Sequence, residues 1–144
     1  MLLGNVTWGD VATEILLPEN VAFHFRVKSA KFVPVKEGQE LNKDGQPNYP
    51  YINVDLVVKS EGEFLGQHIF DNFTMKPGQM FMLRQLAEKT GLDLEEMAQQ
   101  AFDPNVYVDR EGLMLLKKQE AKDGYPAKMR VKKFLSFGEV EADE

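Results

Sequence analysis

The sequence contains no cysteine, which excludes disulfides, thiolate metal sites and a cysteine nucleophile. It also lacks any uncharged apolar run near the roughly 18 residues that a membrane-spanning helix needs. Residues 1–14 contain no Lys or Arg and include Asp10, a pattern that argues against a secretory signal. We therefore expect a soluble intracellular protein of the cytoplasm, without a membrane partner.

Motifs for catalysis are missing as well. There is no Gly-rich phosphate loop, no Gly-x-Ser-x-Gly and no His-Glu-x-x-His. His24 and His68 lie far apart in strand-like segments, where structural or surface roles are favoured over metal binding. The segment that holds Asp103, Asn105 and Asp109 lacks the Gly and the Glu of a calcium loop. We expect no enzyme, cofactor or metal; an enzyme with dispersed carboxylates stays an alternative.

What the sequence does contain is enough apolar material for one globular domain, 43% of 144 residues. The formal net charge of −6 argues against a nucleic-acid partner if it is spread evenly. It is not spread evenly. Residues 20–36 carry four basic and no acidic side chains, and residues 110–135 carry eight basic and three acidic ones. Residues 138–144 carry four acids and are expected to form a disordered tail.

Hydrophobic periodicity predicts three strands, a helical insert and two more strands. The first strand starts at residue 21, with Phe23 and Phe25 facing the core and a bulge at Ser29-Ala30. Helices are predicted around Pro77 to Gly91 and after the cap residue Asp93. The other strands are predicted at Tyr51 to Lys59, Phe64 to Thr74, Leu113 to Lys118 and Ala127 to Phe137.

This order is typical of a five-stranded OB-fold barrel with helices between strands three and four, although other α+β folds share it. We expect an N-terminal extension over residues 1–19, the OB-fold domain over 20–137 and the acidic tail over 138–144. Trp8 belongs to the extension and has no role that the pattern assigns.

Basic and aromatic residues supply the candidate site. The first and last strands of an OB barrel are neighbours, so their outward Lys and Arg could form one basic stripe or could simply solvate the barrel. Tyr49 and Tyr125 fall in the two loops that flank the cleft of such a barrel, and Tyr51 lies on the polar face of its strand. These three tyrosines either stack on nucleobases or are ordinary packing residues. The candidate phosphate contacts are Arg26, Lys28, Lys117, Lys128, Arg130 and Lys132.

Five segments carry a resemblance to a known family: 51–58, 61–66, 69–73, 82–91 and 129–134. Together they resemble a family of small phage single-stranded DNA-binding proteins of the OB-fold type, over roughly residues 20–137. The resemblance implies a non-enzymatic protein that coats single-stranded DNA without sequence preference during phage replication or recombination, in the host bacterial cytoplasm.

A looser parallel concerns the tail. Bacterial and phage single-strand binders often end in an acidic tail that competes with DNA for the basic groove and docks replication or recombination proteins. This tail ends at Glu144 without the aromatic residue common in such tails, so the parallel rests on its charge. The alternative function is a protein-interaction module that uses the same barrel without binding DNA.

Overall fold

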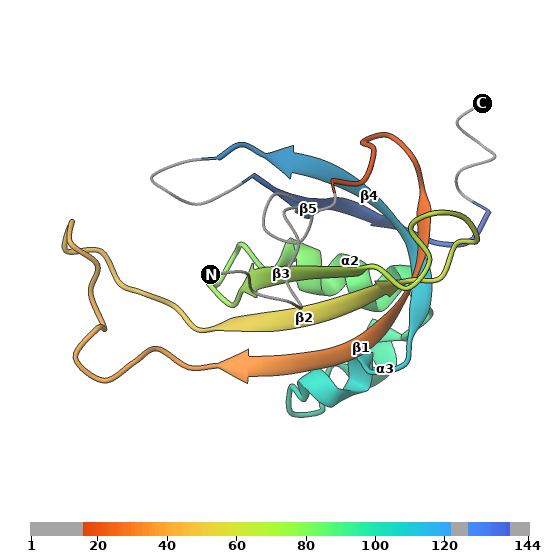
Figure 1. The fold of residues 1–144 in the computed structure, drawn as a ribbon. Coiled ribbons are helices and arrows are strands. Elements are labelled where there is room, and N and C mark those ends of the chain that lie inside the picture. Colours follow the sequence, from red (N-terminus) through yellow and green to blue (C-terminus); the bar gives the residue numbers. More distant parts are fainter. Residues whose placement is uncertain (1–15, 122–126, 139–144) are drawn as a thin grey trace, which may run out of the picture.

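The computed structural model describes residues 16–121 and 127–138 (Figure 1). These residues form a mostly β structure with short helices. In chain order, the elements are β1 (Phe23–Val33), β2 (Tyr51–Val58), β3 (His68–Thr74), α2 (Phe81–Lys89), α3 (Leu94–Met97), the 3₁₀ helix η1 (Pro104–Tyr107), β4 (Glu111–Gln119) and β5 (Lys128–Leu135).

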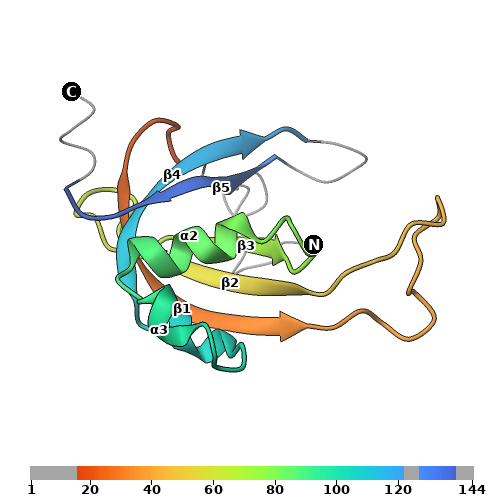
Figure 2. The same cartoon turned by 180° about the vertical axis from the view of Figure 1, so that it is seen from behind.

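The five strands form one antiparallel sheet in the order β3-β2-β1-β4-β5. The sheet is open along its hydrogen-bond ladder but curved, because its two edge strands, β3 and β5, contact each other. Figure 2 shows α2 and α3 on the side of the sheet that faces away in Figure 1, and α2 packs against β5. The prediction of a mostly β, five-stranded domain is confirmed, and the curvature is compatible with a barrel.

β1 pairs with two neighbouring strands and contains a bulge. The register with β2 shifts between Val27 and Ser29, next to the Ser29-Ala30 pair at which the sequence predicted a bulge. The buried side chain that follows Val27 is therefore Ala30 rather than Ser29. An extra residue of this kind bends a strand and increases its twist. The segment from Phe23 to Arg26 pairs with β4, and β1 pairs with β2 on both sides of the bulge, from Phe25 to Val33.

The core lies between the curved sheet and α2. Phe25, Leu56, Met114 and Phe134 are fully buried, and burial of each such side chain contributes roughly 1.5–3 kcal/mol. Tyr107 of η1 is also buried, and its hydroxyl donates to the carbonyl of Leu83 in α2 at 2.9 Å. Removal from water raises the pKa of Tyr107 to about 12.

Several element boundaries differ from those predicted. β3 begins at His68 rather than at Phe64, because the chain turns through Gly66 at φ +85°. α2 begins only after Gly78, whose φ of +83° is not helical, so Pro77 precedes the helix. The predicted cap at Asp93 is present, with its carboxylate accepting from the Glu96 amide at 3.1 Å, but α3 ends at Met97.

Three sequence features lie outside the described residues: Trp8, Tyr125 and the acidic residues of 139–144. In the described ranges, no helix is long and apolar enough to cross a membrane.

Candidate functional site

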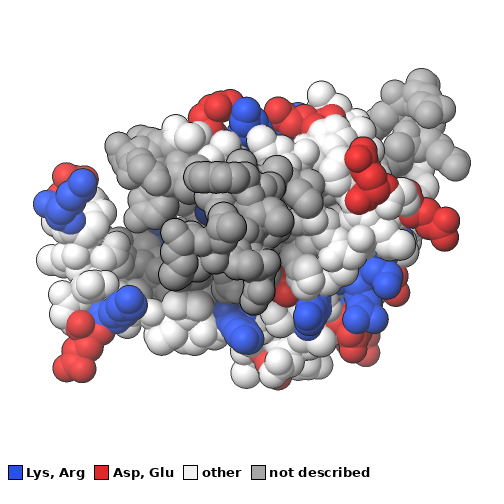
Figure 3. Space-filling model, in the orientation of Figure 1, with Lys and Arg blue, Asp and Glu red and all other residues white. Residues whose placement is uncertain are grey.

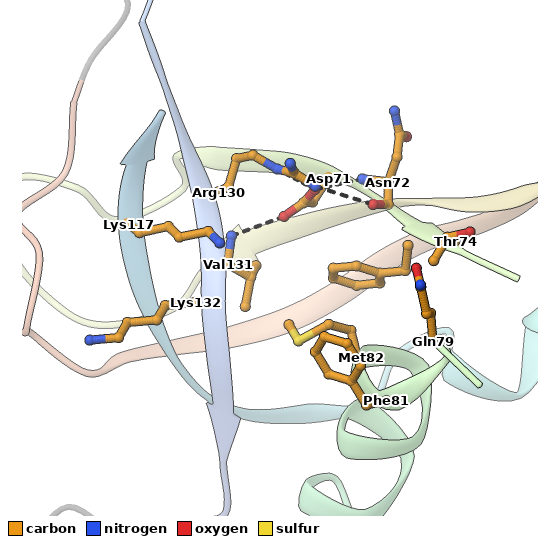
Figure 4. Close-up of a pocket in the computed structure, with 11 residues that line it drawn as sticks. Asp71, Asn72, Thr74, Gln79, Phe81, Met82, Lys117, Arg130, Val131 and Lys132 are labelled. Carbon is orange, nitrogen blue, oxygen red and sulfur yellow. Dashed lines mark hydrogen bonds and ion pairs between the residues drawn. The ribbon is translucent and has the colours of Figure 1, made fainter. Parts of the chain in front are cut away.

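A buried carboxylate joins the two edge strands where they meet. Asp71 points inward from β3, and its side chain is 2% exposed. Its Oδ1 accepts from Nε and Nη2 of Arg130 at 3.0 and 2.8 Å, and its Oδ2 accepts from the Val131 amide at 2.9 Å (Figure 4). No backbone ladder joins β3 to β5 in the described ranges, so this side chain holds the seam between them.

Beside the seam lies a cleft of about 300 Å³, which we call the seam cleft. It is lined by residues of β3, β4, β5 and the start of α2. Phe73, Met82 and Val131 supply apolar lining, and Asn72 and Thr74 supply polar groups. Asn72 also accepts from Asn53 of β2, Nδ2 to Oδ1, at 2.7 Å, so its amide is oriented by the neighbouring strand.

Three cations line the seam cleft, and they differ in their partners. Arg130 is engaged by Asp71, as described above. Lys117 and Lys132 have no carboxylate within 4.0 Å in the part of the chain that the structure describes. In Figure 4, Lys117 extends from β4 toward the seam, while Lys132 extends away from Phe81 and Met82. Two lysine charges are therefore available to an anionic ligand.

Exposed aromatic rings lie at the seam cleft and on the outer face of β3. Phe81, the first residue of α2, lines the seam cleft and is 67% exposed. On the outer face of β3, Phe70 is 57% exposed and stacks on His68, with ring centroids 5.7 Å apart and planes 11° from parallel. His68 Nδ1 lies 2.6 Å from Oδ1 of Asp55, which fixes the orientation of that ring. Exposed ring faces of this kind can stack on nucleobases or pack on a protein partner.

β4 lies between β1 and β5, so the expected basic stripe along neighbouring first and last strands is not formed, and the predicted phosphate contacts do not all lie in one place. Lys117, Arg130 and Lys132 come together in the seam cleft. Lys128 is exposed at the start of β5, opposite Gln119, and does not line the cleft. Arg26 and Lys28 lie on the outer face of β1, and Arg26 Nε is 3.8 Å from an Asp109 carboxylate oxygen. Figure 3 shows basic side chains along the border of the molecule where β1 runs, with acidic ones between them.

The two described tyrosine candidates lie together elsewhere. Tyr49 and Tyr51 line a second hollow, of about 380 Å³, at the base of the β1–β2 connection. Lys76 Nζ lies 5.6 Å from the centroid of the Tyr49 ring, at cation–π distance. The third candidate, Tyr125, falls outside the described residues.

Sequence reasoning missed the roles of Phe81 and Asp71, and it left Phe70 open between a core and a stacking residue. Strict alternation in β3 would have separated exposed Phe70 from buried Asp71, whereas nothing in the helical pattern of α2 marks Phe81 as facing a cleft. In the described ranges, no group of three or more His, Asp or Glu side chains is arranged to hold a metal ion.

The seam cleft offers positive charge, an aromatic ring and amide groups to a ligand. No protein-family model and no curated protein matches this sequence.

Proposed function

We propose that this protein binds single-stranded DNA, with the seam cleft as its principal contact. The observation that carries the proposal is that Lys117, Lys132 and the exposed residue Phe81 all line one cleft. Lysines hold phosphates, and an aromatic face stacks on any base, so this combination binds single strands with little dependence on sequence. The proposed role is that of a non-enzymatic coating protein in phage DNA replication or recombination.

The fold supports the same proposal. We propose that the curved sheet is an OB-fold barrel, since β1 pairs with both β2 and β4 while β3 lies against β5. OB-folds bind oligonucleotides over their second and third strands and the adjoining loops. The seam cleft is built partly on β3, and the second hollow lies under the β1–β2 connection.

The test is the salt dependence of binding. Each phosphate contact on a single strand contributes about −0.7 to the slope of log affinity against log salt concentration. In fluorescence anisotropy with labelled oligo-dT, the double variant Lys117→Ala/Lys132→Ala should bind more weakly, with a slope less steep by about 1.4. Lys59→Ala is the control, because Lys59 is exposed just after β2 and lines neither hollow.

Loss of the Phe81 ring tests the stacking half of the proposal. Phe81→Ala should weaken binding by about 5- to 150-fold, which corresponds to roughly 1–3 kcal/mol per stacked base. Leu65→Ala is its control, since Leu65 is 55% exposed but lies in the turn before β3.

Two results would contradict the proposal. One is absence of binding to oligo-dT by the intact protein at about 50 mM salt. The other is a salt slope that the double lysine variant leaves unchanged. Either would favour the protein-interaction module, for which the exposed Phe81 ring is equally suited.

A further inference from the structure

The second hollow lies between the barrel and the segment of residues 34–50, which we call the arm. Figure 1 shows the arm projecting beyond the ends of β1 and β2. The volume of the hollow, about 380 Å³, lies within the range of roughly 300–1,000 Å³ that is usual for small-ligand sites. Its lining combines the apolar residues Val33 to Val35 with two tyrosines and three polar residues, Lys36, Gln39 and Asn48.

The arm has internal order that gives the hollow a defined wall. Its two halves form a bridge between Leu41 and Pro47. The Asn48 amide donates to the carbonyl of Glu40 at 2.8 Å, and Asn48 Nδ2 donates to the carbonyl of Gln39 at 2.7 Å. These bonds fix Asn48 and the backbone at Gln39 relative to each other, so these two lining residues belong to a paired segment rather than to an irregular loop.

Polar groups in the hollow are left without protein partners. Over the described ranges, no hydrogen bond engages the side-chain amide of Gln39 or Oδ1 of Asn48. Lys36 has no carboxylate within 4.0 Å there either. A side-chain amide whose donor and acceptor are both unused can form hydrogen bonds to the edge of a nucleobase. An aromatic ring beside it can stack on the face of the same base.

The hollow adjoins the seam cleft. Tyr51, which lines the hollow, is the register partner of Thr74, which lines the cleft. Side chains of directly opposed residues in an antiparallel pair lie roughly 5 Å apart. A strand that leaves the seam cleft past Thr74 therefore meets Tyr51 and the mouth of the hollow next.

We propose that the hollow is a base-reading subsite that takes one nucleobase of the strand bound in the seam cleft. The base lies beside Tyr49 and Tyr51, the Gln39 amide pairs with its edge, and Lys36 neutralises the adjoining phosphate. This inference rests on the proposed function and deepens it. Because an amide meets different donors and acceptors on different bases, the subsite adds a base preference to otherwise sequence-independent binding.

The test compares oligo-dT, oligo-dC and oligo-dA of equal length by anisotropy. A well-paired side-chain amide discriminates by roughly 1–3 kcal/mol, so we expect the intact protein to show a spread of at least about 5-fold between best and worst strand. Gln39→Met keeps the length of the side chain and removes its hydrogen bonds; it should reduce that spread to about 2-fold or less. Gln46→Met is the matched control, because Gln46 is an exposed amide of the same arm that does not line the hollow.

Differences in stacking within the oligonucleotides affect all variants equally, so the change in spread between Gln39→Met and Gln46→Met is the deciding quantity. A spread that persists in Gln39→Met overturns the subsite, as does equal affinity of the intact protein for all three strands. Both results leave binding in the seam cleft intact. Failure of the intact protein to bind any strand overturns the proposed function along with the subsite.

Discussion

Replacing Asp71 with alanine should open the seam between β3 and β5. The substitution leaves the Val131 amide, in a buried setting, without its acceptor, at a cost of about 1–3 kcal/mol. It also removes the partner of the Arg130 guanidinium. Breaking a fully buried ion pair costs about 3–5 kcal/mol. Arg130 is 37% exposed and can turn toward water, so its share is smaller. We expect the free energy of unfolding to fall by about 2–4 kcal/mol.

A second ion pair in the protein serves as a control, because its atoms are about as close together as those of Asp71 and Arg130 but its side chains are much more exposed. Arg84 and Glu88 of α2 form an ion pair at 2.9 Å, nearly the same length, but their side chains are 73% and 44% exposed. Removing Arg84 should cost about 0.3–0.5 kcal/mol. Asp71→Asn should fall between the two, because the amide keeps an oxygen for Val131 but loses the charge that holds Arg130.

Urea unfolding followed by far-UV circular dichroism measures these differences directly. The double variant Asp71→Ala/Arg130→Ala should be less destabilised than the sum of the single variants, with a coupling of about 1–3 kcal/mol. If Asp71→Ala costs no more than Arg84→Ala, the seam is not held by this carboxylate and the reasoning is refuted.

Three further predictions concern other parts of the chain. Burial raises the pKa of Tyr107 to about 12, whereas an unfolded tyrosine ionises near pH 10. The free energy of unfolding should therefore decline as pH rises from about 10 toward 12, and it should decline less in Tyr107→Phe. Urea unfolding at about pH 9 and pH 11 measures this difference. Gly112→Ala should lower stability by about 1–3 kcal/mol in thermal unfolding, because its Cβ would lie 3.3 Å from Phe25 Cζ and from Thr90 Cγ2. Deletion of residues 138–144 should strengthen binding to oligo-dT, most at low salt; unchanged affinity would contradict competition between tail and DNA.

Much of the sheet could be predicted because burial of one face imposes period two on a strand. Phe23 and Phe25 are buried as their alternation indicates, and the phase shift at Ser29 marks the bulge. Boundaries were less predictable where apolar residues occur outside strands. Phe64 and Leu65 resemble the start of β3, yet the glycines around them turn the chain, and the strand starts at His68.

The candidate site was predictable only in part, because its contacts join distant segments. The basic character of β4 and β5 indicated Lys117, Arg130 and Lys132, which line one cleft. Nothing local shows that Arg130 is paired with Asp71, 59 residues earlier in the chain. The strand pattern is also silent on Phe81, whose exposure depends on how α2 packs against β5.

The inward carboxylate at Asp71 has a consequence for association between molecules. Edge strands with unpaired amides and carbonyls are templates for pairing with another chain, and an inward-pointing charge on such a strand is one of the devices that discourage it. β3 is an edge strand, and its central segment, Ile69-Phe70-Asp71-Asn72-Phe73, has Asp71 as its one charged residue. An apolar residue at 71 would leave an uncharged, largely apolar edge segment. We therefore expect the residue that closes the seam also to discourage pairing of another chain with β3.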